Sequence, residues 1–570
     1  MKVSDYIVSY LIEKEITDVF GYPGGMVTHL LDSFSKYKED ISAHINYHEQ
    51  GAAFAACGYA QISLKPGFAY ATSGPGVANL LSGICNAYYD SAPAVFLTGQ
   101  VNTYEGKGDS LVRQKGFQEM DVCAMVASVT KYTAYVEDAK DIRYHLDRAF
   151  YNAVSGRPGP AVLDVPMDVQ RQDVVPEELE RYIPEDPGYQ QVNTVVELIH
   201  KALAEAKRPC ILVGAGMQNC GMGEYFRKWI ENVKLPVVSS MLAVDILPES
   251  EYYYGFVGAY GSRQANFIIS KCDLIISFGS RMDIRQTGVN KDNFATNARL
   301  IRVDIDENEF TNKIKENEVD VFIELKKLMP ALLDRHNEMP AMDFSSWLSV
   351  CDEIKSKLAG YDKEYSNLVI EEISKNIDKD SLVTTDVGQN QVWVAQSFIA
   401  RGQRILFSGG HGAMGYSLPA AIGAYYAGKK KVYAFTGDGG FQMNTQELQF
   451  LYRENLPIKV ILLNNSSLGM IRHFQEMYFE SNFVQTKAEA GYTNPDFGAI
   501  AAAYKIPYAK VSCIEDVADI KPFLEDDKPA LIEVDLGDTT YVFPKLSMGK
   551  KPHEQDPELD EELGKYISNL

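Results

Sequence analysis

The chain has 570 residues, of which 46% are apolar and 23% charged, so it has the composition of a globular protein and is too long for a single hydrophobic core. Its 55 lysines and arginines against 77 aspartates and glutamates give a formal net charge of −22 at pH 7, which disfavours nucleic acid and anionic lipid as partners. The N-terminus has no basic region followed by an apolar run, and no stretch approaches the roughly 18 apolar residues of a membrane span, so we expect a cytoplasmic protein.

Helical and strand signals alternate from one end of the chain to the other. Val3, Ile7, Val8, Leu11 and Ile12 recur on one face of a first helix. Short apolar runs that end in Gly, Asp or Asn then follow: AVLDVP (161–166), ILVGAG (211–216), LIISFGS (274–280), LIRVDID (300–306), LVTTDVG (382–388), VYAFTGDGG (432–440) and VILLNN (460–465). Such unalternated, β-branched runs are typical of strands buried on both faces of parallel sheets. We therefore predict an α/β fold of doubly wound parallel sheets.

Two polar, proline-bearing stretches divide the chain. They are PEELERYIPEDPGYQQ (176–191) and the region around RHNEMPAMDFSS (335–346). We predict domains at about 1–175, 190–335 and 360–540, followed by a charged tail at 541–570 with little periodicity. The eight cysteines are scattered and include no CxxC pair, so we expect reduced thiols and not disulfides or a zinc site.

The sharpest local signal is TGDGGFQMNTQEL (436–448) followed by VILLNNSSLGM (460–470). Asp438 follows one predicted strand, and Asn464 and Asn465 end the next. The carboxyl ends of neighbouring parallel strands form the ligand-binding edge of such sheets, and Asp and Asn oxygens suit Mg²⁺ that completes its shell with phosphate. A GDG turn alone is also an ordinary strand-to-helix turn. Its pairing with a downstream NN favours a site for a metal and a phosphorylated ligand.

This pair of motifs resembles the signature of thiamine-diphosphate enzymes, and the likeness to the acetolactate synthase family extends over nearly the whole chain. Segments similar to that family's first domain are GYPGG (21–25), HEQGAAFAACGYA (48–60), TSGPGVANLL (72–81), LTGQV (97–101), FQEMD (117–121) and SGRPGPAVLDVP (155–166). Segments similar to its last domain are DVGQNQVW (386–393) and GAMGYSLPAAIGA (412–424). The resemblance implies a pyrimidine-binding first domain, a central domain, and a last domain that binds diphosphate and Mg²⁺.

The resemblance also assigns roles to individual residues. Asp438, Asn465 and the carbonyl of Ser467 would be the Mg²⁺ ligands. Residues that would contact thiamine diphosphate are Pro23, Ser73, Asn79, Val387, Gly388, Gln389, Asn390, Gly412, Met414, Gly437, Gly439, Gly440, Leu468, Gly469 and Met470, together with the metal ligands. Met414 would support the bent shape of the cofactor, and the dipole of the helix that begins at Gln389 would favour the diphosphate. Taken alone, Met414 and Met470 would be core residues.

Glu49 matches the family glutamate that hydrogen-bonds N1′ of the cofactor's pyrimidine and so promotes loss of the thiazolium C2 proton. Taken alone, it would be a solvated carboxylate. The resemblance places Gly25, Phe117 and Gln118 near the reacting groups. We expect these four residues to form the catalytic set.

After decarboxylation of a 2-oxo acid such as pyruvate, the remaining unit can be protonated, oxidised or added to a second carbonyl. The stretch GKGDSLVRQKGFQEMD (106–121) lacks the His-His pair of simple pyruvate decarboxylases. Glyoxylate carboligase has an apolar residue in place of the cofactor glutamate, whereas this chain has Glu49. We therefore favour carboligation of the acetolactate synthase type, which belongs to branched-chain amino acid biosynthesis. The alternatives are a carboligase with another acceptor such as a keto-sugar, a pyruvate oxidase or decarboxylase, and a non-catalytic homologue.

The central domain resembles the FAD-binding part of acetolactate synthase. FGSRMDIRQTG (278–288) carries Arg285, and Arg157, Gly214, Gly216 and Asp304 are the other residues that would contact FAD, held without a redox role. GAGMQNCG (214–221) alone is weak evidence for a dinucleotide site, because it departs from GxGxxG spacing.

Four features of the sequence depart from the family pattern on the flavin or acceptor side. Ala259-Tyr260-Gly261 replaces the family's MHG, and Met167 stands where a lysine is usual. Phe474 replaces the tryptophan that favours 2-oxobutyrate as acceptor, and the tail at 544–563 differs. These changes leave the acceptor open.

The resemblance further implies an active centre between two subunits, with Glu49 from one chain and Asp438 from the other. We expect a homodimer at least and a homotetramer by analogy with the family. The resemblance leaves open whether the chain works with a small regulatory subunit.

Overall fold

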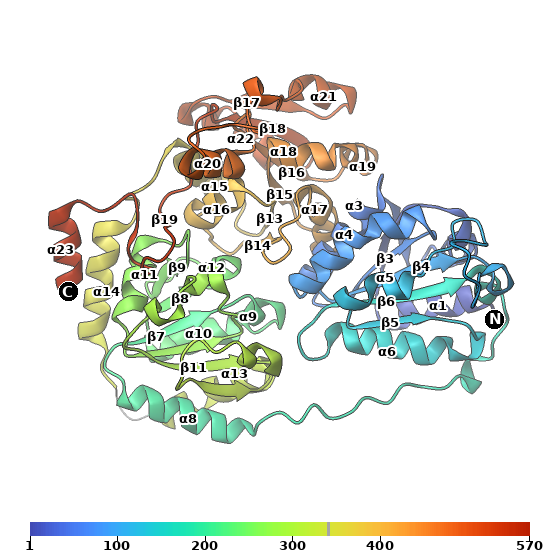
Figure 1. Ribbon diagram of the computed structural model, residues 1–570, viewed down its shortest axis with the longest axis horizontal. Coiled ribbons are helices and arrows are strands. Elements are labelled where there is room, and N and C mark those ends of the chain that lie inside the picture. Colours follow the sequence, from blue (N-terminus) through green and yellow to red (C-terminus); the bar gives the residue numbers. More distant parts are fainter. Residues whose placement is uncertain (339–341) are drawn as a thin grey trace.

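The computed structural model describes residues 1–338 and 342–570; residues 339–341, which fall in the second predicted linker, lie outside the described residues. The chain forms three six-stranded parallel sheets, each flanked by helices, and a small two-stranded sheet near the C-terminus. In Figure 1 the first sheet and its helices lie at the right, the second at the lower left and the third at the top. The predicted α/β class with doubly wound parallel sheets is confirmed.

The first sheet has the strand order β2-β1-β3-β4-β6-β5. Its strands are β1 (Asp18–Gly21), β2 (Ser42–Ile45), β3 (Gly67–Ala71), β4 (Ala94–Gln100), β5 (Tyr132–Tyr135) and β6 (Pro160–Pro166). Its helices are α1 (Val3–Glu13), α2 (Thr28–Lys36), α3 (Glu49–Ser63), α4 (Pro75–Tyr89), α5 (Val122–Val126), α6 (Ile142–Val154) and α7 (Met167–Gln170). Side chains of β3 alternate between two cores, because Phe68 packs with α1 and α6 whereas Ala69 packs with α3 and α4.

The second sheet has the order β12-β11-β10-β7-β8-β9. Its strands are β7 (Pro209–Val213), β8 (Val237–Ser239), β9 (Tyr253–Phe256), β10 (Leu274–Phe278), β11 (Arg299–Asp304) and β12 (Val319–Phe322). Its helices are α8 (Val192–Glu205), α9 (Gly216–Asn219), α10 (Gly223–Val233), α11 (Arg263–Lys271), α12 (Ile284–Thr287) and α13 (Leu325–Asp334). Helix α14 (Ser345–Leu358) also packs here, since Cys351 and Ile354 join the core formed with α11.

The third sheet has the order β14-β13-β15-β16-β18-β17. Its strands are β13 (Leu382–Thr385), β14 (Arg404–Phe407), β15 (Val432–Gly437), β16 (Ile458–Asn464), β17 (Tyr508–Val511) and β18 (Ala530–Asp535). Its helices are α15 (Tyr365–Asn376), α16 (Gln389–Ser397), α17 (Ser417–Gly428), α18 (Asp438–Met443), α19 (Leu448–Glu454), α20 (Gly469–Tyr478), α21 (Phe497–Ala503) and α22 (Lys521–Glu525). Every strand predicted from an apolar run is present in the three sheets.

Helices α3 and α17 join the first and third sheets at close range. A Cβ placed on Gly423 would lie 1.8 Å from the carbonyl oxygen of Ala55, and one on Gly58 would lie 2.1 Å from that of Ala420. Only glycine permits this approach, which is why both helices are rich in small residues. The contact fixes the N-terminus of α3, where Glu49 lies, relative to the third sheet.

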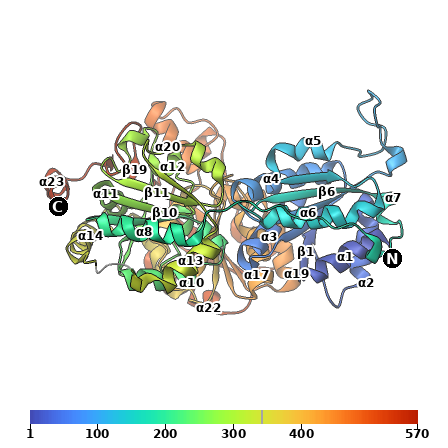
Figure 2. The ribbon, with the colours of Figure 1, turned by 90° about the horizontal axis from the view of Figure 1, so that it is seen from below.

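The first and second sheets are joined by a long segment that is mostly without helix or strand between α7 and α8 (Figures 1 and 2). At the other end of the chain, β19 (Lys545–Leu546), β20 (Gln555–Asp556) and α23 (Glu561–Asn569) form in the tail, for which the sequence predicts little periodicity. Arg263 anchors this tail by donating to the carbonyls of Gln555, at 3.2 Å, and Pro557, and it also pairs with Asp362 before α15.

No helix among the described residues is long and apolar enough to cross a bilayer. All eight cysteines are free thiols.

Candidate active site

The residues predicted to hold metal and diphosphate meet at the carboxyl edge of the third sheet. Strands β13, β15 and β16 are neighbours, and they end at Thr385, Gly437 and Asn464. The segments that follow them begin with Asp386, Asp438 and Asn465. Parallel pairing therefore brings three distant motifs to one edge, as expected for ligand sites in open α/β sheets.

Asp438 is buried at the start of α18, and three N–H groups surround its carboxylate. Oδ1 accepts from the backbone of Gly439 at 2.9 Å, and Oδ2 accepts from the backbone of Ser467 at 3.2 Å and from the amide of Asn494 at 2.6 Å. Ser466 has a φ of +49°, a left-handed turn that aims the Ser467 N–H at Asp438. Burial raises the pKa of Asp438 in the free protein.

Asn465 is oriented so that its amide oxygen remains free. Its Nδ2 donates to Oε1 of Gln389 at 2.8 Å and to the hydroxyl of Thr540 at 2.9 Å, while no described residue donates to its Oδ1. The side chain of Gln389 is thus occupied by Asn465 and Thr540. One carboxylate, one amide oxygen and a carbonyl form a hard donor set that fits Mg²⁺ if phosphate supplies the remaining oxygens.

Glycines at the same edge allow side chains from neighbouring segments to pack closely against the backbone. A Cβ on Gly440 would lie 2.7 Å from the carboxylate of Asp386, and one on Gly469 would lie 1.9 Å from Oε1 of Gln389. The position of a Cβ on Gly439 lies 3.0 Å from the terminal methyl of Met414 and 2.9 Å from a methyl of Leu468. Met414 therefore reaches from its own loop to the predicted diphosphate segment.

Asp386 links the ends of β13 and β15 to the loop that carries Met414, and it is not among the site residues predicted from the sequence. Its carboxylate accepts from the backbone of Val387 at 2.9 Å, from Gly415 at 3.0 Å and from the hydroxyl of Thr436 at 3.2 Å. It is almost fully buried, and burial raises its pKa to about 7. Only its place directly after a predicted strand could have pointed to it.

The remaining predicted contacts of this edge lie at the start of α16, on α20 and on the loop before α17. Gly388 precedes α16 with a φ of +120°, and Gly412 has a φ of +70°. Asn390 donates to the carbonyl of Val387 at 3.0 Å and leaves its buried Oδ1 without a partner among the described residues. Met470 is half-buried against the core of the third sheet. An unpaired buried amide oxygen at this edge is consistent with a ligand site.

We call each six-stranded sheet with its helices a unit. Glu49 lies apart from this edge, in the first unit, at the N-terminus of α3. It is 8% exposed, and its Oε2 accepts from Nδ2 of Asn79 at 2.9 Å. Its other oxygen lies 3.4 Å from the place of a Cβ on Gly76, and the nearby Ser73 is buried with an unpaired hydroxyl. The segments HEQGAAFAACGYA and TSGPGVANLL are thus brought together as one cluster.

The loops predicted to face substrate lie at the same end of the first sheet. Gln118 packs on Gly74, whose Cβ position is 2.9 Å from Cβ of Gln118. Phe117 is 78% exposed, and Pro23 and Gly25 are exposed. No hydrogen bond between described residues joins Glu49 to Asp438 or Asn465. One chain therefore presents two separate clusters: the Glu49 cluster, made of Glu49, Ser73 and Asn79, and the Asp438 cluster, made of Asp438, Asn465 and Ser467.

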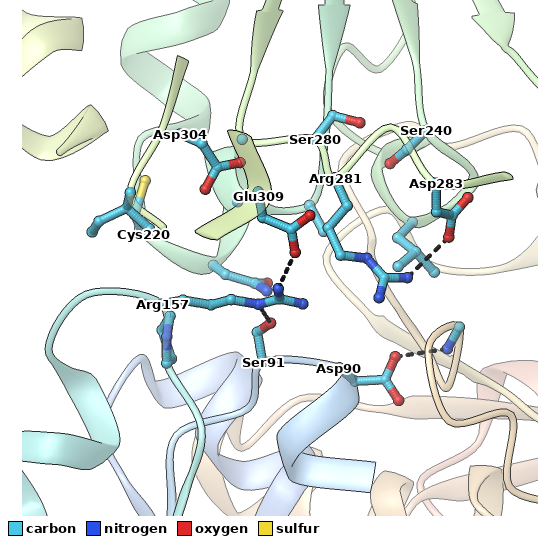
Figure 3. Close-up of a pocket in the computed structure, with 18 of the residues that line it drawn as sticks. Asp90, Ser91, Arg157, Cys220, Ser240, Ser280, Arg281, Asp283, Asp304 and Glu309 are labelled. Atoms are coloured by element: carbon cyan, nitrogen blue, oxygen red, sulfur yellow. Dashed lines mark hydrogen bonds and ion pairs between the residues drawn. The ribbon is translucent and has the colours of Figure 1, made fainter. Parts of the chain in front are cut away.

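A separate cavity of about 240 Å³ lies where the three units meet. Figure 3 shows Arg157 and Ser91 from the first unit facing Glu309 of the second, with Arg281 beside Asp283. Of the residues predicted to contact FAD, those that line the cavity are Arg157, Gly216, Arg285 and Asp304. Gly214 lies beneath the lining, because a Cβ there would meet the carbonyl oxygen of Gly279 at 2.1 Å.

Two buried carboxyls face this cavity, and only Asp304 was singled out from the sequence. Burial raises the pKa of Asp304 and that of Asp90 to about 6. Asp90 accepts from the backbone of Gly409 at 2.9 Å and of Gly410 at 2.6 Å, so it links the first unit to the third (Figure 3). The divergent Ala259 and Tyr260 also line the cavity.

Comparison with known proteins bears on both sites. Three family models match the chain: "Thiamine pyrophosphate enzyme, N-terminal TPP binding domain" over residues 1–125, the "central domain" of the same enzymes over 196–332, and the "C-terminal TPP binding domain" over 386–534.

Similar full-length relatives carry one description. The acetolactate synthase large subunit of Lactococcus lactis subsp. lactis (strain IL1403) is 36% identical over 558 residues, covering 96% of this chain and 94% of the relative. That of Corynebacterium glutamicum is 37% identical, covering 95% and 88%. The acetolactate synthase isozyme 2 large subunit of Escherichia coli (strain K12) is 33% identical, covering 97% and 99%.

Proposed function

Because the chain belongs to the acetolactate synthase large-subunit family of thiamine pyrophosphate enzymes, we propose that it decarboxylates pyruvate and transfers the remaining two-carbon unit to a second carbonyl compound. It is a thiamine-diphosphate-dependent transferase of the acetolactate synthase type. With a second pyruvate as acceptor the product is acetolactate, a precursor in branched-chain amino acid biosynthesis.

The Asp438 cluster carries the proposal. Asp438 and the free oxygen of Asn465, with the carbonyl of Ser467, would hold Mg²⁺, and the backbone of Gly439, Gly440 and Gly469 would lie against the diphosphate. When bound, thiamine diphosphate would supply a nucleophilic thiazolium carbon for the keto group of the 2-oxo acid, and a positively charged ring nitrogen to accept the electron pair that departing CO₂ leaves behind. The protein's part is to hold that group and to exclude water around it.

Glu49 would place a carboxyl against N1′ of the cofactor's pyrimidine and hold the proton there. Asn79 donates to one carboxylate oxygen at 2.9 Å, so the other remains available for the pyrimidine. Burial at the start of α3 keeps this carboxyl away from bulk water. The chain's residues thus supply a fixed acid–base group opposite the diphosphate cradle.

Since no hydrogen bond between described residues joins the Glu49 cluster to the Asp438 cluster, we infer that the complete centre forms between two copies of the chain. Exposed apolar side chains near the two clusters, Phe117, Ile471 and Phe474 among them, support burial against a second copy. We propose a homodimer as the minimal unit, a homotetramer by analogy with the family, a cytoplasmic location, and room for a small regulatory subunit.

The cavity between the three units supports FAD as a further cofactor. Arg281 and Arg285 offer cations for a pyrophosphate, and Gly216 allows close approach of the backbone. Leu242, Phe256 and Val257 provide an apolar wall. No catalytic step is assigned to this cavity.

Two features of the chain bear on which carbonyl compound accepts the two-carbon unit. The absence of histidine in 106–121 supports transfer to a carbonyl over release of acetaldehyde. Phe474 is 50% exposed on α20 in place of the family tryptophan, and it forms an aromatic group with Tyr478 and Phe479. This altered surface leaves a keto-sugar or another carbonyl compound as the alternative acceptor.

The test is product analysis by mass spectrometry. The protein is incubated with pyruvate, Mg²⁺ and thiamine diphosphate, alone and with a panel of 2-oxo acids and keto-sugars. Acetolactate or a crossed carboligation product is expected. Acetaldehyde as the sole product would rule out carboligation, and pyruvate-dependent bleaching of a bound flavin would favour an oxidase.

A further inference from the structure

Tyr492 lies in a short segment, residues 487–494, that folds over the Asp438 cluster. Its hydroxyl oxygen is buried and has no hydrogen-bond partner among the described residues. The oxygen lies 3.2 Å from the place that a Cβ on Gly439 would occupy. A tyrosine hydroxyl is therefore aimed, unpaired, at the backbone proposed to lie against the diphosphate.

The segment is held in this position by its own contacts. The backbone N–H of Tyr492 donates to the carbonyl of Lys487 at 2.9 Å, and Gly491 takes a φ of +95° that reverses the chain. Asn494 donates to Oδ2 of Asp438 at 2.6 Å and to Oδ1 of Asn464 at 2.9 Å. These bonds fix Tyr492 to the same two strand ends that carry the metal motif.

Asp438 and Gln442 are the polar side chains nearest the hydroxyl, and neither is placed to form a hydrogen bond with it. Gln442 donates to the carbonyl of Asp438 at 3.2 Å and to Asn494 at 3.1 Å. The carboxylate of Asp438 accepts from Gly439, Ser467 and Asn494. Since an unpaired buried hydroxyl destabilises a fold, its placement at a ligand site indicates a partner that arrives with the ligand.

We propose that the Tyr492 hydroxyl binds the cofactor by donating a hydrogen bond to a phosphate oxygen of thiamine diphosphate. This assignment rests on the proposed function. Hydrogen bonds from a neutral hydroxyl to an anionic oxygen are short and strong, and the surrounding methyl groups of Met414 and Leu468 exclude water from the contact. Asn494, two residues on, is a positioning residue for Asp438.

The experiment compares Tyr492→Phe with wild type in thiamine-diphosphate binding, measured by titration calorimetry at saturating Mg²⁺. The variant is expected to bind about tenfold more weakly, the effect of losing one charge-assisted hydrogen bond. Without cofactor its melting temperature is expected to equal or exceed that of wild type, because the unpaired hydroxyl is gone. The increase in melting temperature on adding cofactor should be smaller than in wild type.

The control is Tyr504→Phe, whose ring packs on the core shared by the first and third sheets; it should bind like wild type. Equal affinity of Tyr492→Phe and wild type would overturn the assignment and leave the proposed function intact. A Phe variant that is less stable without cofactor, or does not fold, would also overturn it, because the hydroxyl would then be structural. If wild type itself did not bind thiamine diphosphate, the proposed function would fail together with this inference.

Discussion

The carboxylate of Glu447 accepts a hydrogen bond from the side-chain amide of Asn46 at 3.0 Å, although 401 positions separate the two residues. Its other oxygen accepts from the backbone of Tyr47 at 2.9 Å. A Cβ on Gly51 would lie 2.6 Å from the same carboxylate, so Glu447 occupies the space beside the first turn of α3. The segment that follows the Asp438 motif thereby fixes the turn from which Glu49 projects.

Replacement of Glu447 should disturb catalysis through Glu49. Glu447→Ala leaves two buried N–H donors unpaired, at a cost of about 1–3 kcal/mol each. We expect a lower melting temperature and kcat reduced about tenfold, while thiamine-diphosphate affinity changes little. Glu447→Gln keeps an acceptor and the volume, so it should recover most of kcat. An Ala variant that is destabilised but keeps the kcat of wild type would show that the contact is only structural.

Glu49→Gln should separate cofactor binding from cofactor activation. The amide cannot hold the proton at N1′, so kcat should fall by about 10²–10⁴, the usual contribution of a general acid–base group. Cofactor affinity should stay near that of wild type because the Asp438 cluster is untouched. Steady-state kinetics and calorimetry measure the two quantities, and the exposed carboxyl variant Glu39→Gln serves as the control. Retained activity in Glu49→Gln would exclude the proposed role.

Two glycines should respond differently to an added methyl group. In Gly440→Ala the new Cβ would lie 2.7 Å from the buried carboxylate of Asp386, so we expect loss of stability and of cofactor binding. Gly25 has no neighbouring atom within 4 Å of such a Cβ, so Gly25→Ala should keep the melting temperature of wild type. If Gly25 faces the reacting groups, the KM for pyruvate or the product ratio should change. Thermal melts and product analysis of both variants decide these points.

Stability should depend on pH through Asp164. Its carboxyl accepts from Thr98 at 2.6 Å and Gln100 at 3.0 Å, and burial raises its pKa from 3.8 to about 7. Between these values the folded protein holds a proton that the unfolded chain releases, so stability falls as pH rises, by at most about 1.4 kcal/mol per unit.

Asp164→Asn removes this titration. Between pH 5 and pH 8 it should lose roughly 2–3 kcal/mol less stability than wild type, measured by urea unfolding. The exposed Asp109→Asn should retain the pH dependence of wild type. Identical profiles for Asp164→Asn and wild type would contradict the assignment of a raised pKa.

The cavity between the units can be tested for flavin directly. Arg285 is exposed, lines the cavity, and forms no ion pair among the described residues, so Arg285→Ala should fold normally. We expect FAD affinity to decrease about tenfold, the loss of one charged contact to a phosphate. Flavin fluorescence measures the binding, and Arg299→Ala on β11, which pairs with Glu205, is the control. Equal FAD affinity in both variants would place the anion elsewhere.

The sequence alone determined the parts of this protein that are written in consecutive residues. Buried strands such as β10 and β16 appear as mainly apolar runs because both faces of a parallel sheet are covered. The GDG and NN motifs directly follow such runs, so their meeting at one sheet edge was predictable. Short strands such as β5, which is mostly half-buried, carry no comparable pattern.

Only the tertiary structure decided which residues support the site. Asp386, Thr540, Asn494 and Glu447 each act on a motif that lies between 29 and 401 positions away. Asp386 and Glu447 stand within motifs visible in the sequence, but their partners are not, and nothing in the local sequence distinguishes Thr540 and Asn494 from ordinary polar residues. The unpaired hydroxyl of Tyr492 likewise depends on how its segment folds over Gly439. Burial and hydrogen-bond partners are set by packing between distant segments, so they become known only when those segments have been placed in space.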